Sequence, residues 1–166
     1  MHYYITLEPD SNDTLFATCP ALPECNSFGD DVDDALAHVL DSVETALADR
    51  IAERLDIPGP GRRRKAQYTL TLPTRVAAKV EIYKAMRAKG MRKADLARAL
   101  NVQAVQIDRL LSLSHRTSLD SLDDAFRALG QTMTLNVSTA EVRVGREIRQ
   151  KPRSAAKGTA RRRAVA

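Results

Sequence analysis

The sequence predicts an α+β fold, in which a small sheet covered by one long helix is followed by a helical domain that ends in a strand. Three observations support this: alternating β-rich segments near the N-terminus, a helical stripe of apolar residues over 32–55, and short amphipathic segments after Pro73. At 166 residues the chain has room for about two small domains and a tail. We expect domains at 1–72 and 73–137 and a tail at 138–166.

The first domain begins with a predicted hairpin. Residues 3–8 (YYITLE) and 15–19 (LFATC) are rich in β-forming residues, and a turn-like stretch separates them. Residues 26–28 can add a third strand, and residues 68–72 (YTLTL) can add another. The connector at 57–66 is rich in Pro, Gly and Arg, which predicts an exposed loop before the last strand.

A long helix is predicted between the third strand and the connector. Over 32–55 apolar residues recur at helical spacing, and the acidic residues lie mostly opposite them. Asp30 and Asp31 are placed to cap this helix. Asp33 and Asp34 favour the positive end of its dipole. The four carboxylates could instead hold a divalent metal, although capping and the dipole already account for them. The expected apolar stripe is Ala35, Leu36, Val39, Leu40, Val43, Ala46, Leu47, Ile51 and Leu55.

The segment 92–111 (RKADLARALNVQAVQIDRLL) has the apolar spacing of a helix-turn-helix. Leu96, Ala97 and Leu100 share one face of a first short helix. Asn101 lies where the chain must turn with positive φ, a conformation that Asn tolerates. The expected inner face of the second helix is Val105, Ile107, Leu110 and Leu111. The residues left pointing outward are Gln103, Ala104, Gln106, Asp108 and Arg109.

This pattern predicts DNA binding, because Gln and Arg side chains can bond adenine and guanine edges in a major groove. We expect Arg109 and Gln106 to contact base edges. A helical hairpin buried in an unrelated fold is one alternative, and Arg109 could also pair with Asp95 or Asp108. The candidate DNA-binding residues are Arg92, Lys93 and Arg116 for phosphates, with Gln103, Ala104, Gln106 and Arg109 on the outward face.

Further elements flank this segment. Thr74 is expected to cap the helix before it, and Thr117 or Ser118 to cap the helix after it, at 119–129. Residues 132–137 (TMTLNV) then alternate like a strand that has no mate in its own domain. We therefore expect a homodimer built partly on this strand. Its alternate residues are Met133, Leu135 and Val137.

Charge divides the chain unevenly. Residues 1–56 contain two basic and 13 acidic residues, a net charge of −11, whereas the remainder carries +16. The basic part suits a phosphate backbone, and the acidic part suits a basic protein or is a solvated face without a partner. The tail at 138–166 has a net charge of +7 and few apolar residues. We expect it to be disordered and to add attraction to nucleic acid or solubility.

Composition excludes several kinds of site. Cys19 and Cys25 have no histidine at a zinc spacing and are expected to be reduced, and the three histidines are scattered. No apolar run is long enough to span a bilayer, and the first residues lack the pattern of a signal peptide. We expect a cytoplasmic protein with no metal or other cofactor.

In their order these motifs resemble the HicB family of antitoxins, from bacterial toxin–antitoxin pairs. The resemblance rests on YYITLE, LFATCPALPEC, FGDDVDDAL, the Pro-rich connector and VAAKVEIYKAMRAKGMRKADLARALNV, and it covers residues 3–137. Glu24 departs from it, because the family usually has Gly in this turn. Arg92 and Gln103 also depart from it, since they occupy cap positions where Ser or Thr is more common.

The resemblance implies a degenerate RNase H-like βββαβ domain joined to a helix-turn-helix of the phage-repressor type. It also implies that the first domain inhibits a HicA toxin, a small basic protein that cleaves mRNA, and that the second domain binds operator DNA and represses the operon. An acidic domain can stand in for RNA phosphates on a basic toxin. We therefore expect toxin contacts at acidic side chains of the first domain, namely Asp10, Glu24, Asp30, Asp31, Asp33 and Asp34.

Two other functions remain open at this point. A stand-alone repressor would use the first domain to sense a small molecule. A magnesium-dependent RNase H-like nuclease would use Asp10, Asp30, Asp31 or Asp34, but that chemistry needs carboxylates converging from separate strands. Because most of these acids crowd one helix start, we expect no catalysis.

Overall fold

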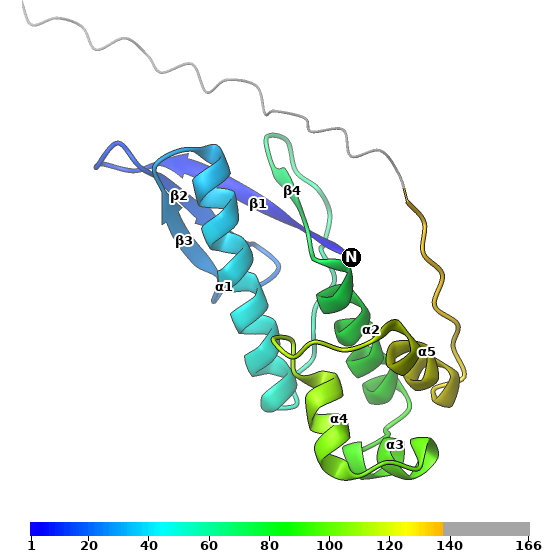
Figure 1. The fold of residues 1–166 in the computed structure, drawn as a ribbon. Helices are drawn as coiled ribbons and strands as arrows, with labels where there is room; N and C mark the ends of the chain where they lie inside the picture. Colours follow the sequence, from blue (N-terminus) through cyan, green and yellow to red (C-terminus); the bar gives the residue numbers. More distant parts are fainter. Residues whose placement is uncertain (138–166) are drawn as a thin grey trace, which may run out of the picture. The chain divides into compact units, whose positions relative to one another are not determined.

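The fold was obtained as a computed structural model, which describes residues 1–137 of the chain (Figure 1). Its elements follow the predicted order, with three strands, a long helix and a fourth strand before four shorter helices. Contacts join Met1–Asn136 into one unit. The α+β prediction is confirmed at this level, whereas the division into domains at residues 72 and 73 stays a prediction.

The four strands form one antiparallel sheet in the order β3–β2–β1–β4. β1 (His2–Pro9) pairs on one side with β2 (Leu15–Thr18), and β2 pairs in turn with β3 (Asn26–Gly29). β4 (Tyr68–Thr71), which follows the connector, pairs with the other side of β1. All four strands lie at the predicted positions, and each end is within one residue of the expected bound.

One face of this sheet is buried and the other is open. Tyr3 and Ile5 of β1 and Ala17 of β2 belong to the buried face and have no exposed surface. On the open face Phe16 and Phe28 lie opposite each other on β2 and β3, with ring centroids 4.8 Å apart. Phe28 is 50 % exposed, so the open face includes an accessible aromatic pair.

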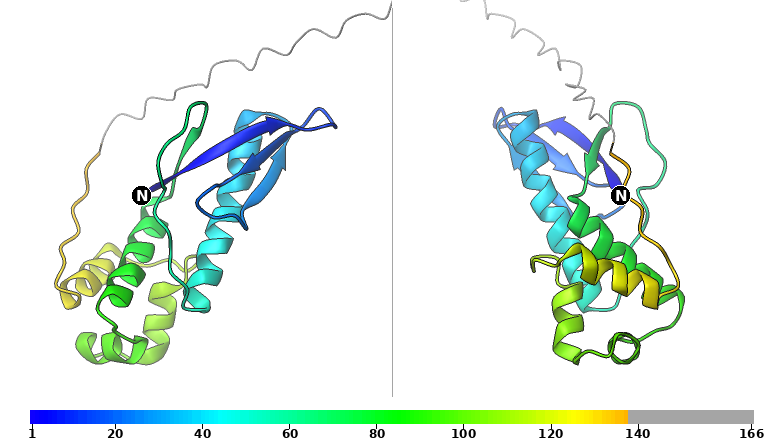
Figure 2. Two further views of the ribbon diagram at one scale, coloured as in Figure 1. Left: turned by 180° about the vertical axis from the view of Figure 1, so that it is seen from behind. Right: turned by 45° about the vertical axis from the view of Figure 1, so that its right-hand side comes forward.

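The long helix α1 (Val32–Ala52) lies along the buried face and contacts β3 and β2, as both views of Figure 2 show. A Cβ atom at Gly29 would lie 2.2 Å from the Ala35 nitrogen, so this close approach of strand and helix requires glycine. The Asp31 carboxylate accepts a hydrogen bond from the Asp34 N–H over 2.9 Å, which confirms the predicted cap.

The helix ends earlier than the apolar stripe predicts. Arg54 adopts a left-handed conformation (φ 59°), and the Leu55 N–H donates to the Arg50 carbonyl over 2.8 Å. This is the hydrogen-bond pattern of a Schellman end, which turns the chain away from the helix axis. Leu55 consequently lies outside the helix and is 46 % exposed, so its assignment to the buried stripe was wrong.

Four shorter helices complete the described part. They are α2 (Thr74–Ala88), α3 (Lys93–Leu100), α4 (Ala104–Leu111) and α5 (Leu119–Ala128). α2 contacts α1, α4 and α5, and α3 contacts both α4 and α5. α2 therefore connects the sheet-and-helix part of the chain with the remaining helices (Figure 1).

The predicted caps of α2 and α5 differ in outcome. Pro73 is the cap residue of α2, since its carbonyl accepts the first helical bond, from the Ala77 N–H over 2.9 Å. Thr74 is already helical, so its assignment as the cap was wrong, because Pro73 with its restricted φ already makes the turn into the helix. Ser118 caps α5 as predicted, with its hydroxyl accepting from the Ser121 N–H.

No strand forms at 132–137 in the single chain, which corrects the expected C-terminal strand. A strand needs a hydrogen-bonded neighbour, and this segment pairs with no described strand. Met133 instead packs partly against the core, while Leu135 is 57 % exposed and Val137 is 98 % exposed. The expectation of a disordered tail concerns residues 138–166, which lie outside the described residues. None of the described helices combines the length and the apolar character needed to cross a membrane.

Candidate functional sites

A tight turn at 101–103 joins α3 to α4. Asn101 has a left-handed backbone with φ 52°, as the sequence predicts, and the Val102 N–H donates to the Ala97 carbonyl over 2.9 Å. Leu96 and Ile107 are almost fully buried between the helices. The turn and the inner face of α3 thus lie where the pattern of residues 92–111 predicts them.

Arg92 and Gln103 occupy the cap positions of α3 and α4, as the family resemblance implied. Their side chains, however, accept no hydrogen bond from the first turn of the helix. Asp95 accepts a hydrogen bond from the Arg92 N–H over 2.9 Å, and Gln106 accepts one from the Gln103 N–H over 3.1 Å. The third residue of each helix therefore satisfies the backbone donor of the cap residue. The Gln106 oxygen is occupied in this way, while its amide nitrogen can still donate.

The outer face of α4 differs from the predicted one at a single residue. Ile107, Leu110 and Leu111 are buried as expected. Val105, predicted on the inner face, is 48 % exposed, so that assignment was wrong. At 100° per residue Val105 lies opposite the three buried side chains and one turn before Arg109, which is exposed. The two side chains share the outermost line of the helix.

Ion pairs border this face. Lys93 pairs with Asp108 over 2.7 Å, and Arg98 pairs with Asp95. Arg109 makes no ion pair with any residue of the described part, so the alternative of a bridge to Asp95 or Asp108 is not observed. Exposed pairs of this kind contribute about 0–1 kcal/mol, so a phosphate could readily compete for Lys93.

An open groove of about 330 Å³ lies between α4 and the start of α5. Gln106, Arg109 and Arg116 all line it, together with the cap residue Ser118. The structure thus brings three of the predicted DNA-binding residues to one concave surface. Two guanidinium groups and a helix N-terminus favour an anion here, and the Asp124 carboxylate that also lines the groove is paired with Arg127 over 3.2 Å.

The residue that holds α4 against α2 was not foreseen from the sequence. Lys79 has no exposed surface, and its ammonium group donates to the carbonyls of Arg109 (3.3 Å), Ser112 (2.6 Å) and His115 (2.7 Å). Burial, with a smaller effect of Arg75, lowers the pKa of Lys79 to about 8. The only hint in the sequence was a lysine between Val76 and Val80 on an apolar helix face.

At the acidic start of α1, two carboxylates accept hydrogen bonds from the backbone, and two others have no partner among the described residues. The Asp31 side chain caps the helix, and the Asp34 carboxylate accepts a bond from the Asp30 N–H over 3.0 Å. His38 bonds the Phe28 carbonyl over 2.8 Å, and this bond, helped by Asp34, raises the pKa of His38. Within the described residues no hydrogen bond or ion pair engages the side chains of Asp30 and Asp33, so these two are available to a partner.

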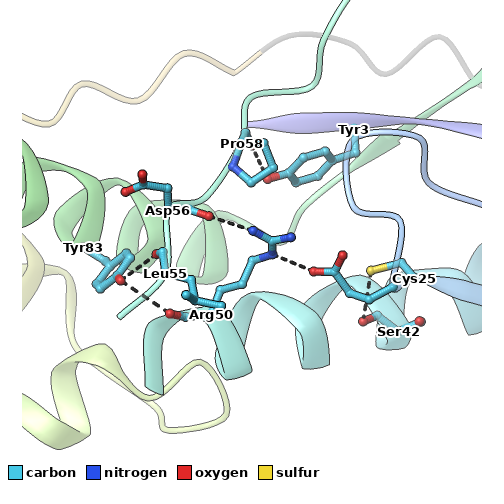
Figure 3. A network of polar contacts seen from close by, with 9 residues as sticks. Tyr3, Cys25, Ser42, Arg50, Leu55, Asp56, Pro58 and Tyr83 are labelled. Atoms are coloured by element: carbon cyan, nitrogen blue, oxygen red, sulfur yellow. Dashed lines mark hydrogen bonds and ion pairs between the residues drawn. The ribbon is translucent and has the colours of Figure 1, made fainter. Parts of the chain in front are cut away.

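Glu24, a predicted toxin contact, is paired within the chain. Its carboxylate accepts a hydrogen bond from Arg50 over 2.6 Å, which lowers the pKa of Glu24. Arg50 also donates to the Asp56 carbonyl over 2.8 Å, as Figure 3 shows. The Asp56 carboxylate pairs in turn with Arg87 of α2 over 2.6 Å. Glu24 therefore belongs to a chain of contacts that reaches the helical part.

Two tyrosines hold the start of the connector close to this chain of contacts (Figure 3). The Tyr3 hydroxyl donates to the Pro58 carbonyl over 2.9 Å, and the Tyr83 hydroxyl donates to the Leu55 carbonyl over 2.8 Å. Tyr3 is in β1, one of the two inner strands of the sheet, and Tyr83 is in α2. The connector is consequently fixed at its start, although its composition predicted an exposed loop throughout.

The remaining predicted toxin contact, Asp10, lies in the turn after β1, where its N–H donates to the Thr14 carbonyl over 2.8 Å. Within residues 1–137 no group of three or more His, Cys, Asp or Glu side chains is arranged to hold a metal ion. In the described part the carboxylates considered for a nuclease therefore form no such group.

Comparison with known proteins shows similarity to antitoxins. A family model described as a HicB-like antitoxin of bacterial toxin–antitoxin systems matches residues 2–81. Antitoxin HicB of Pseudomonas fluorescens (strain Pf0-1) is 34 % identical over 134 residues, covering 80 % of this chain and 90 % of that protein. Antitoxin HicB 2 of Photorhabdus laumondii is 34 % identical over 136 residues, 81 % and 95 % of the two chains. Antitoxin HicB of Escherichia coli (strain K12) is 27 % identical over 135 residues, 81 % and 98 % of the two chains. The chain belongs to the HicB family of antitoxins.

Proposed function

We propose that this protein neutralises a HicA-type toxin through its acidic N-terminal part and represses its own operon by binding operator DNA with α3 and α4 as a helix-turn-helix. The observation that carries the proposal is the combination of family membership with the division of charge, −11 over residues 1–56 and +16 beyond them. A basic toxin and a DNA backbone are partners of opposite charge, so each part of the chain has a matching partner.

Toxin binding is supported by the carboxylates at the start of α1. Asp30 and Asp33 are exposed, and within the described residues no other group engages their side chains. Asp31 and Asp34 already stabilise the helix start. We therefore expect Asp30 and Asp33 to contribute most to the attraction of a basic toxin, and the capping acids to contribute less.

Calorimetry with the full chain and its HicA-type toxin tests this assignment. The double variant Asp30→Asn, Asp33→Asn should weaken binding, and rising salt should also weaken it, because the attraction between opposite charges is screened. Asp31→Asn is the matched control, since Asn also caps helices well. No binding by the folded full chain would refute the antitoxin assignment, whereas binding insensitive to salt and to the double variant would refute only the electrostatic explanation.

DNA binding is supported by the outward face of α4 and its border. Arg109 is exposed and without an ion pair in the described part, the Gln106 amide nitrogen is free to donate, and both line the groove that Arg116 shares. Arg109→Ala should cost about 1–3 kcal/mol on a specific site and relax its base preference, whereas Lys93→Ala should weaken binding to all sequences and flatten the salt dependence. Footprints unchanged by the double variant Arg109→Ala, Gln106→Ala would exclude α4 as the reading helix.

A homodimer would place two such helices on one operator, with half-sites about one helical turn apart. The support is the segment 132–137, which has no strand partner in the described chain and exposes Leu135 and Val137. Pairing with the same segment of a second copy would satisfy its backbone groups. Leu135→Pro removes one N–H and should yield monomers in sedimentation experiments. A folded, dimeric Leu135→Pro variant would place the interface elsewhere.

A further inference from the structure

Val105 is an apolar side chain in an unusual position. Single exposed apolar residues are common on protein surfaces, so exposure alone says little. Here, however, the side chain is 48 % exposed, is not among the residues that pack against the core, and lies on the outermost line of α4 in its first turn. Arg109, the residue proposed to read bases, lies one turn further along the same line. Any duplex that α4 enters would meet Val105 as early as Arg109.

Apart from the methyl group of Ala104, the exposed side chains near Val105 on α4 are polar, and Asp108 among them pairs with Lys93 over 2.7 Å. Gln103 and Gln106 lie in the same turn, and the Gln106 oxygen already accepts the Gln103 N–H, which leaves its amide nitrogen as a donor. Arg109 adds further donors. Most of the surrounding surface therefore suits acceptor atoms of bases and phosphates, and Val105 is suited only to an apolar group.

The major groove presents one apolar feature, the C5-methyl group of thymine. We propose that Val105 packs against a thymine methyl group next to the base contacted by Arg109, and so selects thymine at that operator position. The inference rests on the proposed binding of DNA by α4 and adds to it the chemistry of one base position. It also explains why a β-branched apolar residue occupies a position that is 48 % exposed.

Deoxyuridine provides a direct test, because it differs from thymidine only by the absence of this methyl group. Duplexes that bind the full chain are selected from a pool with a randomised centre, and each thymine of the tightest duplex is then replaced in turn by deoxyuridine. For the wild-type chain we expect an affinity loss of about fourfold per methyl group at one thymine in each half-site.

Two variants complete the test. Val105→Ala should bind the natural duplex about fourfold more weakly per half-site and should lose no further affinity when that thymine becomes deoxyuridine. Val105→Thr keeps one methyl group and should retain part of the sensitivity. Alanine forms helices better than valine, so weaker binding by Val105→Ala cannot come from a melted α4, and a thermal melt checks this.

The outcomes separate the inference from the function on which it rests. If the wild-type chain selects no sequence, the proposed DNA binding fails and the inference fails with it. If it selects a sequence but Val105→Ala shows the wild-type deoxyuridine profile, only the thymine contact is refuted. An unchanged profile together with dissociation into monomers would place Val105 in a protein interface and would also overturn the inference.

Discussion

Replacing Lys79 by Met tests whether a buried ammonium group holds α4 in place. The variant removes the donor from three carbonyl oxygens, those of Arg109, Ser112 and His115. A buried acceptor left unpaired costs roughly 1–3 kcal/mol, and we take the lower end of that range because the variant also relieves the burial of the charge. The Ser112 carbonyl keeps the His115 N–H as a donor over 3.2 Å, so the carbonyls of Arg109 and His115 are the two that lose theirs. We expect Lys79→Met to lower the free energy of unfolding by about 2 kcal/mol.

Urea unfolding measures this change through the midpoint at constant slope. Lys84→Met is the matched control, since it makes the same substitution in the same helix at a residue whose side chain is 37 % exposed and, among the described residues, pairs only with Glu81. That variant should lose less than about 1 kcal/mol. Equal stability of the two variants would refute the view that Lys79 anchors the end of α4.

Comparing the wild type with Lys79→Met also gives a prediction for the dependence of stability on pH. The native pKa of Lys79, about 8, lies below its ordinary value of 10.5, so the native state releases this proton before the unfolded state does. Between these values the unfolded chain binds more protons, and the stability of the wild type therefore rises relative to Lys79→Met. Unfolding of both proteins from about pH 7 to about pH 10 measures the gap, and a gap that narrows contradicts the lowered pKa.

Two further predictions concern the sheet-and-helix part. Gly29→Ala should cost at least about 3 kcal/mol in thermal or urea unfolding, because its Cβ would meet the Ala35 backbone. Gly59→Ala should cost almost nothing, because apart from its chain neighbours no described residue has an atom within 4 Å of the added Cβ. Cys19 and Cys25 are each 1 % exposed, and burial raises the pKa of both thiols, that of Cys25 to about 12. An aromatic disulfide reagent should therefore react with them only in urea, and rapid reaction with the folded protein would show that the region opens locally.

Most of the fold could be predicted from short-range patterns. The alternation of residues in 3–8 and 15–19, the helical stripe after Asp31 and the turn at Asn101 each depend on neighbours a few positions away. The predicted helix boundaries were wrong where a neighbouring residue could also begin or end the helix. The cap residue of α2 is Pro73 and not Thr74. The left-handed conformation of Arg54 ends α1 before Leu55, the last residue of the expected apolar stripe.

The strand expected at 132–137 failed for a different reason. Its alternation is real in the sequence, but a strand exists only with a hydrogen-bonded neighbour, and residues 1–137 offer none to this segment. The alternating pattern shows that the segment is able to form a strand. It forms one only if another strand, such as that of a second chain, pairs with it. Dimerisation through it stays a prediction.

By itself the sequence determined the order of the elements, the family resemblance and the opposite charges of the two parts, because these depend on residue types and local spacing. Only the tertiary structure decided that Val105 faces outward, that Glu24 is paired with Arg50 and that Lys79 bonds three distant carbonyls, one in α4 and two in the loop after it. The partners in these contacts are 26 to 36 positions apart. Such contacts depend on how helices and strands pack against one another, and no local pattern of residues specifies that packing.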